Sequence, residues 1–446
     1  MAAKKAATKE KGKKQKQEPE KPKKASKKAS AVPVASAPVE AKVAEYTANP
    51  FTKQRELSSK EKREALQALR TERDGLLYPA DEAENQYMIR RPTGIIELDI
   101  ALGGGFPAGG ASMLSGPFNS GKSWLMFRTI AMQQQIYGND FLGAVHIGEM
   151  AFPYDQALQA GCRLRVPDVI LNQWEEWRYY RGLPKFTREE VAYFQSQVGH
   201  LEIISGSTGE EVLESVLACT EKNIFSVIGV DSISGLQPAA DADKDLDDAD
   251  KRGAHATMMK RFWLKFVPLM NRGRNSTSVL FVQQVVANQE RANMHPSIQK
   301  YVQEWAVRGG ESTKHFKLID LVMWSGEKIS RGSQDERDVI GKWVKYRTLK
   351  GKAGTHDNIS GEFPFYYHLG GVDIHGELIA SALRRGVLVI TPQGMQAFSA
   401  ETRQPIAGML ARNDQEFRTL LMQSFDLELA LRREVLTAAG RPCLYR

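Results

Sequence analysis

Residues 116–123 read Gly-Pro-Phe-Asn-Ser-Gly-Lys-Ser, a complete G-x-x-x-x-G-K-[ST] motif. The motif follows the apolar run 111–115 and precedes a segment, 124–133, with helical spacing of apolar residues. A strand, a glycine-rich loop and a helix in this order direct backbone N–H groups and a helix N-terminus toward phosphate groups. We therefore expect a nucleoside triphosphate and Mg²⁺ to bind, with Lys122 on the phosphates and Ser123 on the metal. The expected nucleotide-binding residues of the loop are Gly116, Pro117, Phe118, Asn119, Ser120, Gly121, Lys122 and Ser123.

The composition is that of a protein with a substantial core. The chain has 446 residues, 42% of them hydrophobic, which suits one large domain or two. No apolar run approaches the roughly 18 residues of a membrane span, and no apolar segment follows the basic N-terminus as in a signal peptide. The three cysteines lie far apart and form no C-x-x-C pair, which disfavours a zinc site or a disulfide framework. We expect a cytoplasmic protein without membrane partners, in the host cytoplasm if the source is viral.

Positive charge is concentrated at the N-terminus. Residues 1–30 contain twelve lysines and three glutamates, and the net charge of the whole chain is +8, so the remainder is nearly neutral. Residues 1–50 are rich in Ala, Lys, Pro and Ser and are predicted to be a disordered tail. Such a tail either strengthens nucleic-acid binding through phosphate contacts or acts as a solubilising extension.

Folded structure is predicted to begin near Leu57. Ser58 to Glu61 has the pattern of a capping box, and apolar residues recur at helical spacing through about Arg73. We interpret residues 51–90 as an N-terminal helical element for oligomerisation. It packs on a neighbouring subunit or, alternatively, on its own core.

Between about residues 91 and 370, segments typical of strands alternate with segments typical of helices. This alternation predicts an α/β fold with a mostly parallel twisted sheet flanked by helices. Residues 371–446 are expected to form a small C-terminal α+β part. The predicted strands are 111–115, 141–148, 201–205, 224–231, 278–284, 318–324, 342–348 and 363–368. The predicted helices are 122–136, 153–160, 187–197, 209–221, 254–271, 374–385 and 412–433.

Three polar residues end predicted strands. Asp231 ends the apolar segment 224–231 and is expected to hold Mg²⁺ opposite Ser123. Glu149 follows strand 143–148, where a carboxylate can polarise the water that attacks a γ-phosphate. Gln284 ends strand 279–284 and can bond the γ-phosphate, although a strand ending in glutamine is weak evidence by itself.

Several motifs in one order resemble the RecA-like recombinases. They are Arg91 to Gly109 with the phosphate loop, His146 to Met150, Val230 to Pro238, Met258-Met259, Phe281 to Gln284 and Gly309-Gly310. Farther on, Lys345 to Thr348 and Gly370 to Ile379 resemble the UvsX-type recombinases of phages, as does the region after Pro392. The resemblance implies a RecA-like P-loop ATPase core over residues 91–370. It also implies that Glu149 is the catalytic glutamate and Gln284 the γ-phosphate sensor.

The resemblance further implies a recombinase that forms a helical homo-oligomeric filament on single-stranded DNA and exchanges strands with double-stranded DNA. Lys345 and Arg347 match basic residues that reach the ATP of the neighbouring subunit. A single-strand-binding protein and a loader are candidate partners. A ring motor, a regulatory ATPase or a non-catalytic nucleotide-gated DNA-binding protein remain alternatives, because the phosphate loop and Asp231 are shared by all of them.

In this family two loops contact DNA, and they correspond here to about 240–251 and 285–308. The first carries six aspartates, which repel phosphate, but its D-x-D-x-D spacing does not make an EF-hand because Leu246 stands where glycine is needed. The second interleaves basic and large apolar residues, which suits DNA binding or a mobile lid. The expected DNA-binding residues are Lys251, Arg252, Lys260, Arg261, Arg291, Lys300, Arg308 and Lys314.

Residues 168–199 are additional relative to RecA and contain clustered aromatic and basic residues. Such a cluster can stack on unpaired bases, but we favour local packing of its aromatic side chains. Trp124, next to the phosphate loop, is expected in the core.

Overall fold

The structure is a computed structural model that describes residues 58–72, 89–149, 151–196, 199–242, 253–271, 275–287, 305–307, 310–332 and 338–441. The chain divides into two units, Met1–Ala68 and Leu69–Arg446. The tail over residues 1–50, predicted to be disordered, and both candidate DNA loops lie largely outside the described residues. None of the described helices has both the length and the apolar character of a membrane span.

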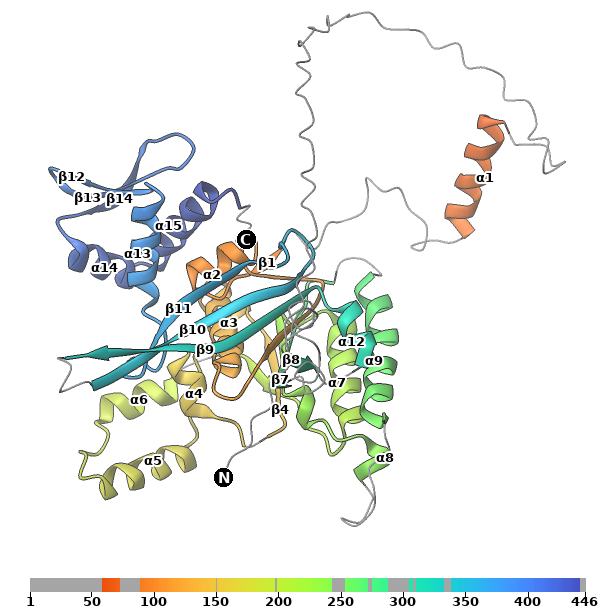
Figure 1. Cartoon of the computed structure of the whole chain (residues 1–446), viewed down its shortest axis with the longest axis horizontal. Coiled ribbons are helices and arrows are strands. Elements are labelled where there is room, and N and C mark those ends of the chain that lie inside the picture. The colour runs from red at the N-terminus through yellow and green to blue at the C-terminus, as the bar shows by residue number, and fades with distance from the viewer. Residues whose placement is uncertain are drawn as a thin grey trace, which may run out of the picture. The chain divides into compact units, whose positions relative to one another are not determined.

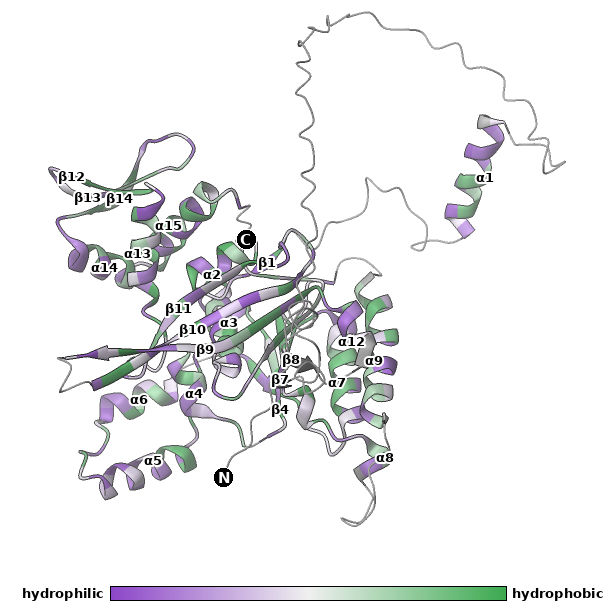
Figure 2. Ribbon diagram, in the orientation of Figure 1, coloured by the Kyte–Doolittle hydropathy of each residue, from purple (hydrophilic) through white to green (hydrophobic). Residues whose placement is uncertain are grey.

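The helix α1 (Ser59–Glu72), which begins in the first unit, starts with the expected capping box. Ser58 Oγ accepts from the amide of Glu61, and the amide of Ser58 donates to Glu61 Oε2 at 2.7 Å. Hydrophobic and hydrophilic residues alternate along this helix (Figure 2). The predicted helix at 59–73 is confirmed.

The second unit is an α/β structure (Figure 1). Its helices are α2 (Ile96–Ala101), α3 (Lys122–Tyr137), α4 (Tyr154–Gln159), α5 (Asp168–Tyr180), α6 (Arg188–Ser196), α7 (Gly209–Lys222), α8 (Ala239–Ala242), α9 (Ala254–Asn271), α12 (Gly310–Phe316), α13 (Ile374–Arg384), α14 (Asp414–Gln423) and α15 (Phe425–Ala438), with 3₁₀ turns η3 (Gly138–Asp140) and η4 (Ile233–Gly235). Its strands are β1 (Arg90–Arg91), β2 (Phe106–Pro107), β3 (Gly110–Gly116), β4 (Gly143–Ile147), β5 (Leu201–Ile203), β6 (Val227–Asp231), β7 (Ser278–Ala287), β8 (Trp305–Val307), β9 (Ile319–Arg331), β10 (Asp338–Gly351), β11 (Ser360–Tyr366), β12 (Leu388–Thr391), β13 (Gly394–Phe398) and β14 (Pro405–Ala411).

One sheet organises this unit, with strand order β11-β10-β9-β3-β7-β6-β4-β5 and β8 paired to β7. The strands from β9 to β5 pair in parallel, whereas β9, β10 and β11 form an antiparallel meander and β8 is antiparallel to β7. All seven residues of β3 are buried, as expected for a central strand covered on both faces. The predicted mostly parallel sheet flanked by helices is confirmed.

Helices cover the sheet on both faces. On one face, α3 packs on β3 and its neighbours through a core that includes Phe127 and Leu280. On the other face, α7 and α9 form a core that includes Trp263 and Phe281. The first five residues of β9 are buried and the rest are half-buried or exposed, and the strand changes there from mainly hydrophobic to mainly hydrophilic (Figure 2).

The remaining secondary-structure predictions are confirmed with shifted boundaries, apart from one. The helix predicted at 412–433 is wrong as one element, because Ser424 leaves helical geometry and its hydroxyl caps the start of α15. The strand predicted at 141–148 begins only at Gly143, after η3. The sequence also failed to predict α5 and the sheet β12-β13-β14.

The C-terminal elements α13–α15 and β12–β14 gather in one lobe, drawn in blue in Figure 1, with its own hydrophobic core. Ile96 of α2 belongs to that core. Glu97 of α2 pairs with both Arg384 and Arg385, at 2.5 and 2.8 Å. The lobe is therefore joined to α2 of the α/β core by apolar and ionic contacts.

Candidate nucleotide-binding site

The register of the sheet brings four strand ends to one edge. Gly116 pairs with Gln284 across β3 and β7, and Asp231 pairs with Val282 across β6 and β7. Ile147, two residues before Glu149, pairs with Asp231 across β4 and β6. β3 and β4 are consecutive in the chain, but β7 and β6 lie between them in the sheet. In open α/β sheets, ligands bind at the carboxyl ends of the strands where the strand order changes in this way.

The phosphate loop has the backbone that its glycines permit. A Cβ on Gly116 would lie 2.1 Å from the carbonyl oxygen of Met323, and Gly121 has a φ of +88° at the N-cap of α3. Asn119 also has a positive φ, of 56°. The first amide that closes a turn of α3 is that of Leu125, which donates to Gly121 O at 2.9 Å. The amides before it are available as donors to an anion.

Lys122 is buried and folds back on its own loop. Its Nζ donates to Pro117 O at 2.7 Å and to Ser120 Oγ at 3.3 Å. Burial lowers its pKa, while the nearby carboxylates of Asp231 and Glu149 act in the opposite direction. The ammonium group therefore lies between the phosphate loop and two acidic side chains.

Asp231 lies close to Ser123, the other residue expected to bind Mg²⁺. The Ser123 hydroxyl, at the start of α3, lies close enough to the Asp231 carboxylate to affect its pKa. Burial raises the pKa of Asp231 and the charge of Glu149 raises it further, whereas the Ser123 hydroxyl and the charge of Lys122 lower it. A divalent cation between Ser123 and Asp231 would relieve the electrostatic cost of this buried acid.

Glu149 is held by two neutral donors. Ser232 Oγ and Gln284 Nε2 each donate to the same oxygen of Glu149, Oε1, at 2.7 Å. Ser232 is fully buried, whereas Glu149 is exposed. Its other oxygen is thus not used by either donor.

These residues fit ATP and Mg²⁺. At Gly116 the absence of a side chain lets the backbone come close to a phosphate. The loop amides and the Lys122 ammonium are donors for phosphate oxygens. Ser123 and Asp231 supply one hydroxyl and one carboxylate, a set suited to Mg²⁺, which takes few protein ligands and completes its shell with water and phosphate. When bound, the metal would neutralise charge on the phosphates.

Sequence reasoning missed two contacts at this site. In the sequence, Ser232 is recognisable only as part of the motif Val230 to Pro238, and its position directly after Asp231 is the signal that identifies it. Lys342 of β10 donates to Asn119 O at the tip of the phosphate loop and to Ser325 Oγ at 3.3 Å. No local pattern connects Lys342 to a loop that lies more than 200 residues earlier, as β10 reaches it only through the sheet.

Lys345 and Arg347 lie on one face of β10, opposite the buried side chains of Val344 and Tyr346. Nζ of Lys345 lies 3.8 Å from Oε2 of Glu362, and Nη2 of Arg347 donates to Oδ1 of Asn358 at 2.9 Å. Among the described residues, no hydrogen bond or ion pair joins either of them to the phosphate loop. The structure therefore does not bring this pair to the nucleotide site of its own chain.

The expected DNA-binding residues are only partly described. Lys251, Arg252, Arg291, Lys300 and Arg308 lie outside the described residues. Lys260 and Arg261 are exposed on α9, and Lys314 is exposed on α12. Their role in DNA binding stays a prediction.

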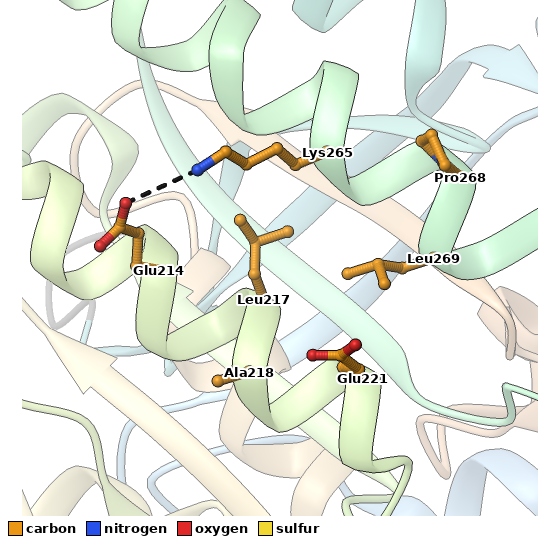
Figure 3. Close-up of a pocket in the computed structure, with 7 residues that line it drawn as sticks. All are labelled: Glu214, Leu217, Ala218, Glu221, Lys265, Pro268 and Leu269. Carbon is orange, nitrogen blue, oxygen red and sulfur yellow. Dashed lines mark ion pairs between the residues drawn. The ribbon is translucent and has the colours of Figure 1, made fainter.

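A surface pocket of about 470 Å³ lies between α7 and α9 (Figure 3). Apolar side chains, among them Leu217 and Leu269, form its floor, and the ion pair of Lys265 with Glu214, at 3.6 Å, lies on its rim. No residue of the phosphate loop lines it.

Trp124, expected in the core, is indeed buried, with its ring 5.3 Å from that of Phe365.

The chain is similar in sequence to known RecA proteins. No protein-family model matches the chain. It is 26% identical to Protein RecA of Chloroflexus aurantiacus over 300 residues, which cover 66% of this chain and 70% of that protein. It is 24% identical to Protein RecA of Lactococcus lactis subsp. cremoris over 321 residues (70% and 68%) and of Enterococcus faecium over 316 residues (70% and 75%). These similarities support a RecA-like recombinase family for the chain.

Proposed function

We propose that this protein is an ATP-dependent recombinase that forms filaments on single-stranded DNA and promotes homologous pairing and strand exchange. The observation that carries the proposal is the contact of Gln284 with Glu149. Gln284 lies on β7, and β7 leads directly into residues 288–304 of the candidate second DNA loop. A change at the γ-phosphate can therefore be transmitted along one strand to the DNA-binding loop.

In the proposed mechanism, each side chain has one role. Lys122 and the loop amides bind the phosphates, while Ser123 and Asp231 hold Mg²⁺. Glu149, oriented by Ser232, positions the attacking water through its remaining oxygen. Gln284 moves between Glu149 and the γ-phosphate and so reports which nucleotide is bound.

A second route links the DNA loop to the phosphate loop. Lys317, which directly follows α12, forms a buried ion pair with Asp320, and the other oxygen of Asp320 accepts from Ser115 at 3.2 Å. Ser115 immediately precedes Gly116. Since α12 begins at Gly310, where the second loop ends, this buried pair supports coupling between DNA and nucleotide.

Filament assembly would use β10 and α1. Lys345 and Arg347 are on a face of β10 that does not serve the site of their own chain, which supports a role at the ATP of a neighbouring subunit. The helix α1 places Ala65, Leu66 and Leu69 at helical spacing, and the pocket between α7 and α9 suits an apolar helix face from another copy.

We further propose a UvsX-type protein that acts in the cytoplasm, that of the host if viral, with a single-strand-binding protein and a loader as partners.

The decisive experiment measures ATP hydrolysis by the full-length chain with and without single-stranded DNA, together with strand exchange between a circular single strand and a linear duplex. We expect hydrolysis to rise on addition of the single strand and exchange to require ATP. Hydrolysis that depends on DNA without any strand exchange would favour the ring motor. An equal rate of hydrolysis with and without DNA would favour a regulatory ATPase.

A further inference from the structure

The helical hairpin α5–α6 has a small core of its own. The rings of Trp174, Phe186 and Phe194 lie 5.5 to 6.5 Å from one another. The side chain of Gln195 donates to Asp168 at 2.6 Å, which joins the end of α6 to the start of α5. In Figure 1 the two helices lie together at the lower left. The expected local packing thus accounts for these three rings.

The end of α5, the start of α6 and the turn between them, residues 177–188, which we name the hairpin tip, have a defined shape. The guanidinium of Arg178 lies over the ring of Phe186, 4.3 Å from its centroid, and its Nε donates to Pro184 O at 2.6 Å. Gly182 takes a φ of +66°, which lets the chain leave α5. Thr187 and Glu190 then form a capping box that begins α6.

Three aromatic side chains of the hairpin tip do not take part in this packing. The exposed fractions of Trp177, Tyr179 and Tyr180 are 53%, 73% and 77%. The guanidinium of Arg181 lies 4.7 Å from the centroid of the Trp177 ring. Large aromatic surfaces left in water are costly, so this cluster is explained best by a ligand that covers it.

The hairpin tip also carries basic side chains, with Glu175 and Glu176 directly before it and Glu189 and Glu190 directly after it. Residues 177–188 include four basic side chains and no aspartate or glutamate. Within the described part of the chain, no carboxylate forms an ion pair with Arg181, Lys185 or Arg188. Exposed aromatic rings between unpaired cations match a ligand that has both flat unsaturated rings and negative charges, and single-stranded nucleic acid has both. Duplex DNA does not suit the rings, because its bases are already stacked on one another.

We propose that the hairpin tip is a second binding site for single-stranded DNA, separate from residues 240–251 and 285–308. Tyr179 and Tyr180 stack on bases, and Arg181, Lys185 and Arg188 contact phosphates. The inference rests on the proposed function in one respect, namely that DNA is the ligand of this protein.

The direct test is photocrosslinking of the full-length chain to oligothymidylate that contains 5-iododeoxyuridine, followed by mapping of the crosslinked peptides. A stacked ring reacts with the iodinated base, so we expect crosslinks at Tyr179 or Tyr180. Tyr193 is the matched control, because it is an exposed ring on α6 outside the hairpin tip.

Two variants give the energetic test by fluorescence anisotropy with the same oligonucleotide. Tyr179→Ala combined with Tyr180→Ala should weaken binding by about fivefold or more, from the usual contribution of one or two stacked bases. Arg181→Gln combined with Lys185→Gln and Arg188→Gln should reduce the slope of log affinity against log salt by about 2, since each phosphate contact to a single strand contributes about 0.7. Tyr193→Ala should bind as the wild type does.

The outcomes separate this inference from the proposed function. If wild-type protein binds the oligonucleotide but crosslinks map only outside residues 177–188 and both tip variants bind normally, the second site is wrong and the recombinase proposal stands. That result would assign the exposed rings to a protein partner instead. If wild-type protein binds no single-stranded DNA with ATP present, the recombinase proposal itself fails. Melting temperatures equal to that of the wild type would show that the tip variants fold.

Discussion

At the scale of single residues, the hydrogen bonds around Glu149 define how it can act. Ser232 and Gln284 both donate to Oε1, so the second oxygen can orient a water molecule. Lys122 and Asp231 lie close enough for their charges to interact with Glu149. A glutamine at position 149 would keep the shape but could not act as the base.

Glu149→Gln should therefore reduce ATP hydrolysis by roughly a hundredfold or more while nucleotide binding persists. Steady-state hydrolysis and binding of a fluorescent ATP analogue measure the two effects. Asp155→Asn, in the first turn of α4, is the control. Normal turnover in Glu149→Gln with a large loss in Asp155→Asn would move the catalytic role to Asp155.

Ser232→Ala tests the contact that the sequence did not predict. Loss of the hydroxyl frees Glu149 to rotate, so kcat should fall severalfold with little change in KM for ATP, because the phosphates are bound elsewhere. Ser234→Ala is the matched control, since the Ser234 hydroxyl is buried without a hydrogen-bond partner in the described structure. Equal kinetics in the two variants would contradict the positioning role of Ser232.

At the scale of elements, β10 connects two regions. One of its residues, Lys342, contacts Asn119 in the phosphate loop of its own chain. Two others, Lys345 and Arg347, are on the face proposed to reach a neighbour. A shift of β10 would therefore affect both its own nucleotide site and the subunit boundary.

Lys345→Ala combined with Arg347→Ala should leave the fold and ATP binding nearly normal but strongly reduce hydrolysis stimulated by DNA and cooperative filament growth. Hydrolysis assays and electron microscopy of filaments measure these effects. Lys328→Ala, on the neighbouring strand β9, is the control. Mixing the double variant with the Lys122→Ala variant should restore partial hydrolysis. At some subunit boundaries, an intact Lys122 from the double variant then meets an intact Lys345 and Arg347 from the other variant. Filaments that form without any restored activity would show that the pair does not act in trans.

At the scale of the whole molecule, the ATPase core and the C-terminal lobe meet around a carboxyl group. Oε2 of Glu377, on α13, is buried without a hydrogen-bond partner in the described structure. Folding raises the pKa of Glu377 to about 8: burial is the largest cause, the charge of Arg432 acts in the opposite direction, and the charges of Glu97 and Asp99 add to the increase. A carboxyl whose pKa is raised by folding stabilises the protein fully below its unfolded pKa, and this contribution is lost as pH rises through the folded value.

Melting temperature should therefore decrease between about pH 5 and pH 8, and Glu377→Gln should flatten this decrease and raise the melting temperature at pH 8. The measurement is thermal unfolding as a function of pH. Glu401→Gln, at an exposed position of the same lobe, is the control. A pH profile unchanged by Glu377→Gln would show that this carboxyl is already ionised in the folded protein at neutral pH.

The N-terminal tail is tested at the same scale. Deleting residues 1–30 removes a net charge of +9. If the tail contacts DNA, affinity for single-stranded DNA should fall and its dependence on salt should become weaker. Fluorescence anisotropy over a series of salt concentrations measures both. An unchanged slope would leave the tail with a solubilising role only.

The sequence by itself determined the local elements of this protein. The phosphate loop, the capping boxes and the apolar strand segments each lie within a few neighbouring residues, so their conformation follows from steric limits and hydrogen bonding along the chain. For this reason β3, α3 and α7 were predicted nearly to the residue. The class of the site was predictable too, because Lys122 and Ser123 are part of one motif.

Only the tertiary structure decided which distant residues meet. Ser232 and Glu149 are 83 residues apart, and Gln284 and Glu149 are 135 apart, and their contacts exist because the strand order places β4, β6 and β7 side by side. The contact of Lys342 with Asn119 and the exposure of Tyr179 and Tyr180 likewise depend on how elements pack. Residues far apart in sequence carry no local signal of their pairing, since sheet order is set by the packing of the whole core.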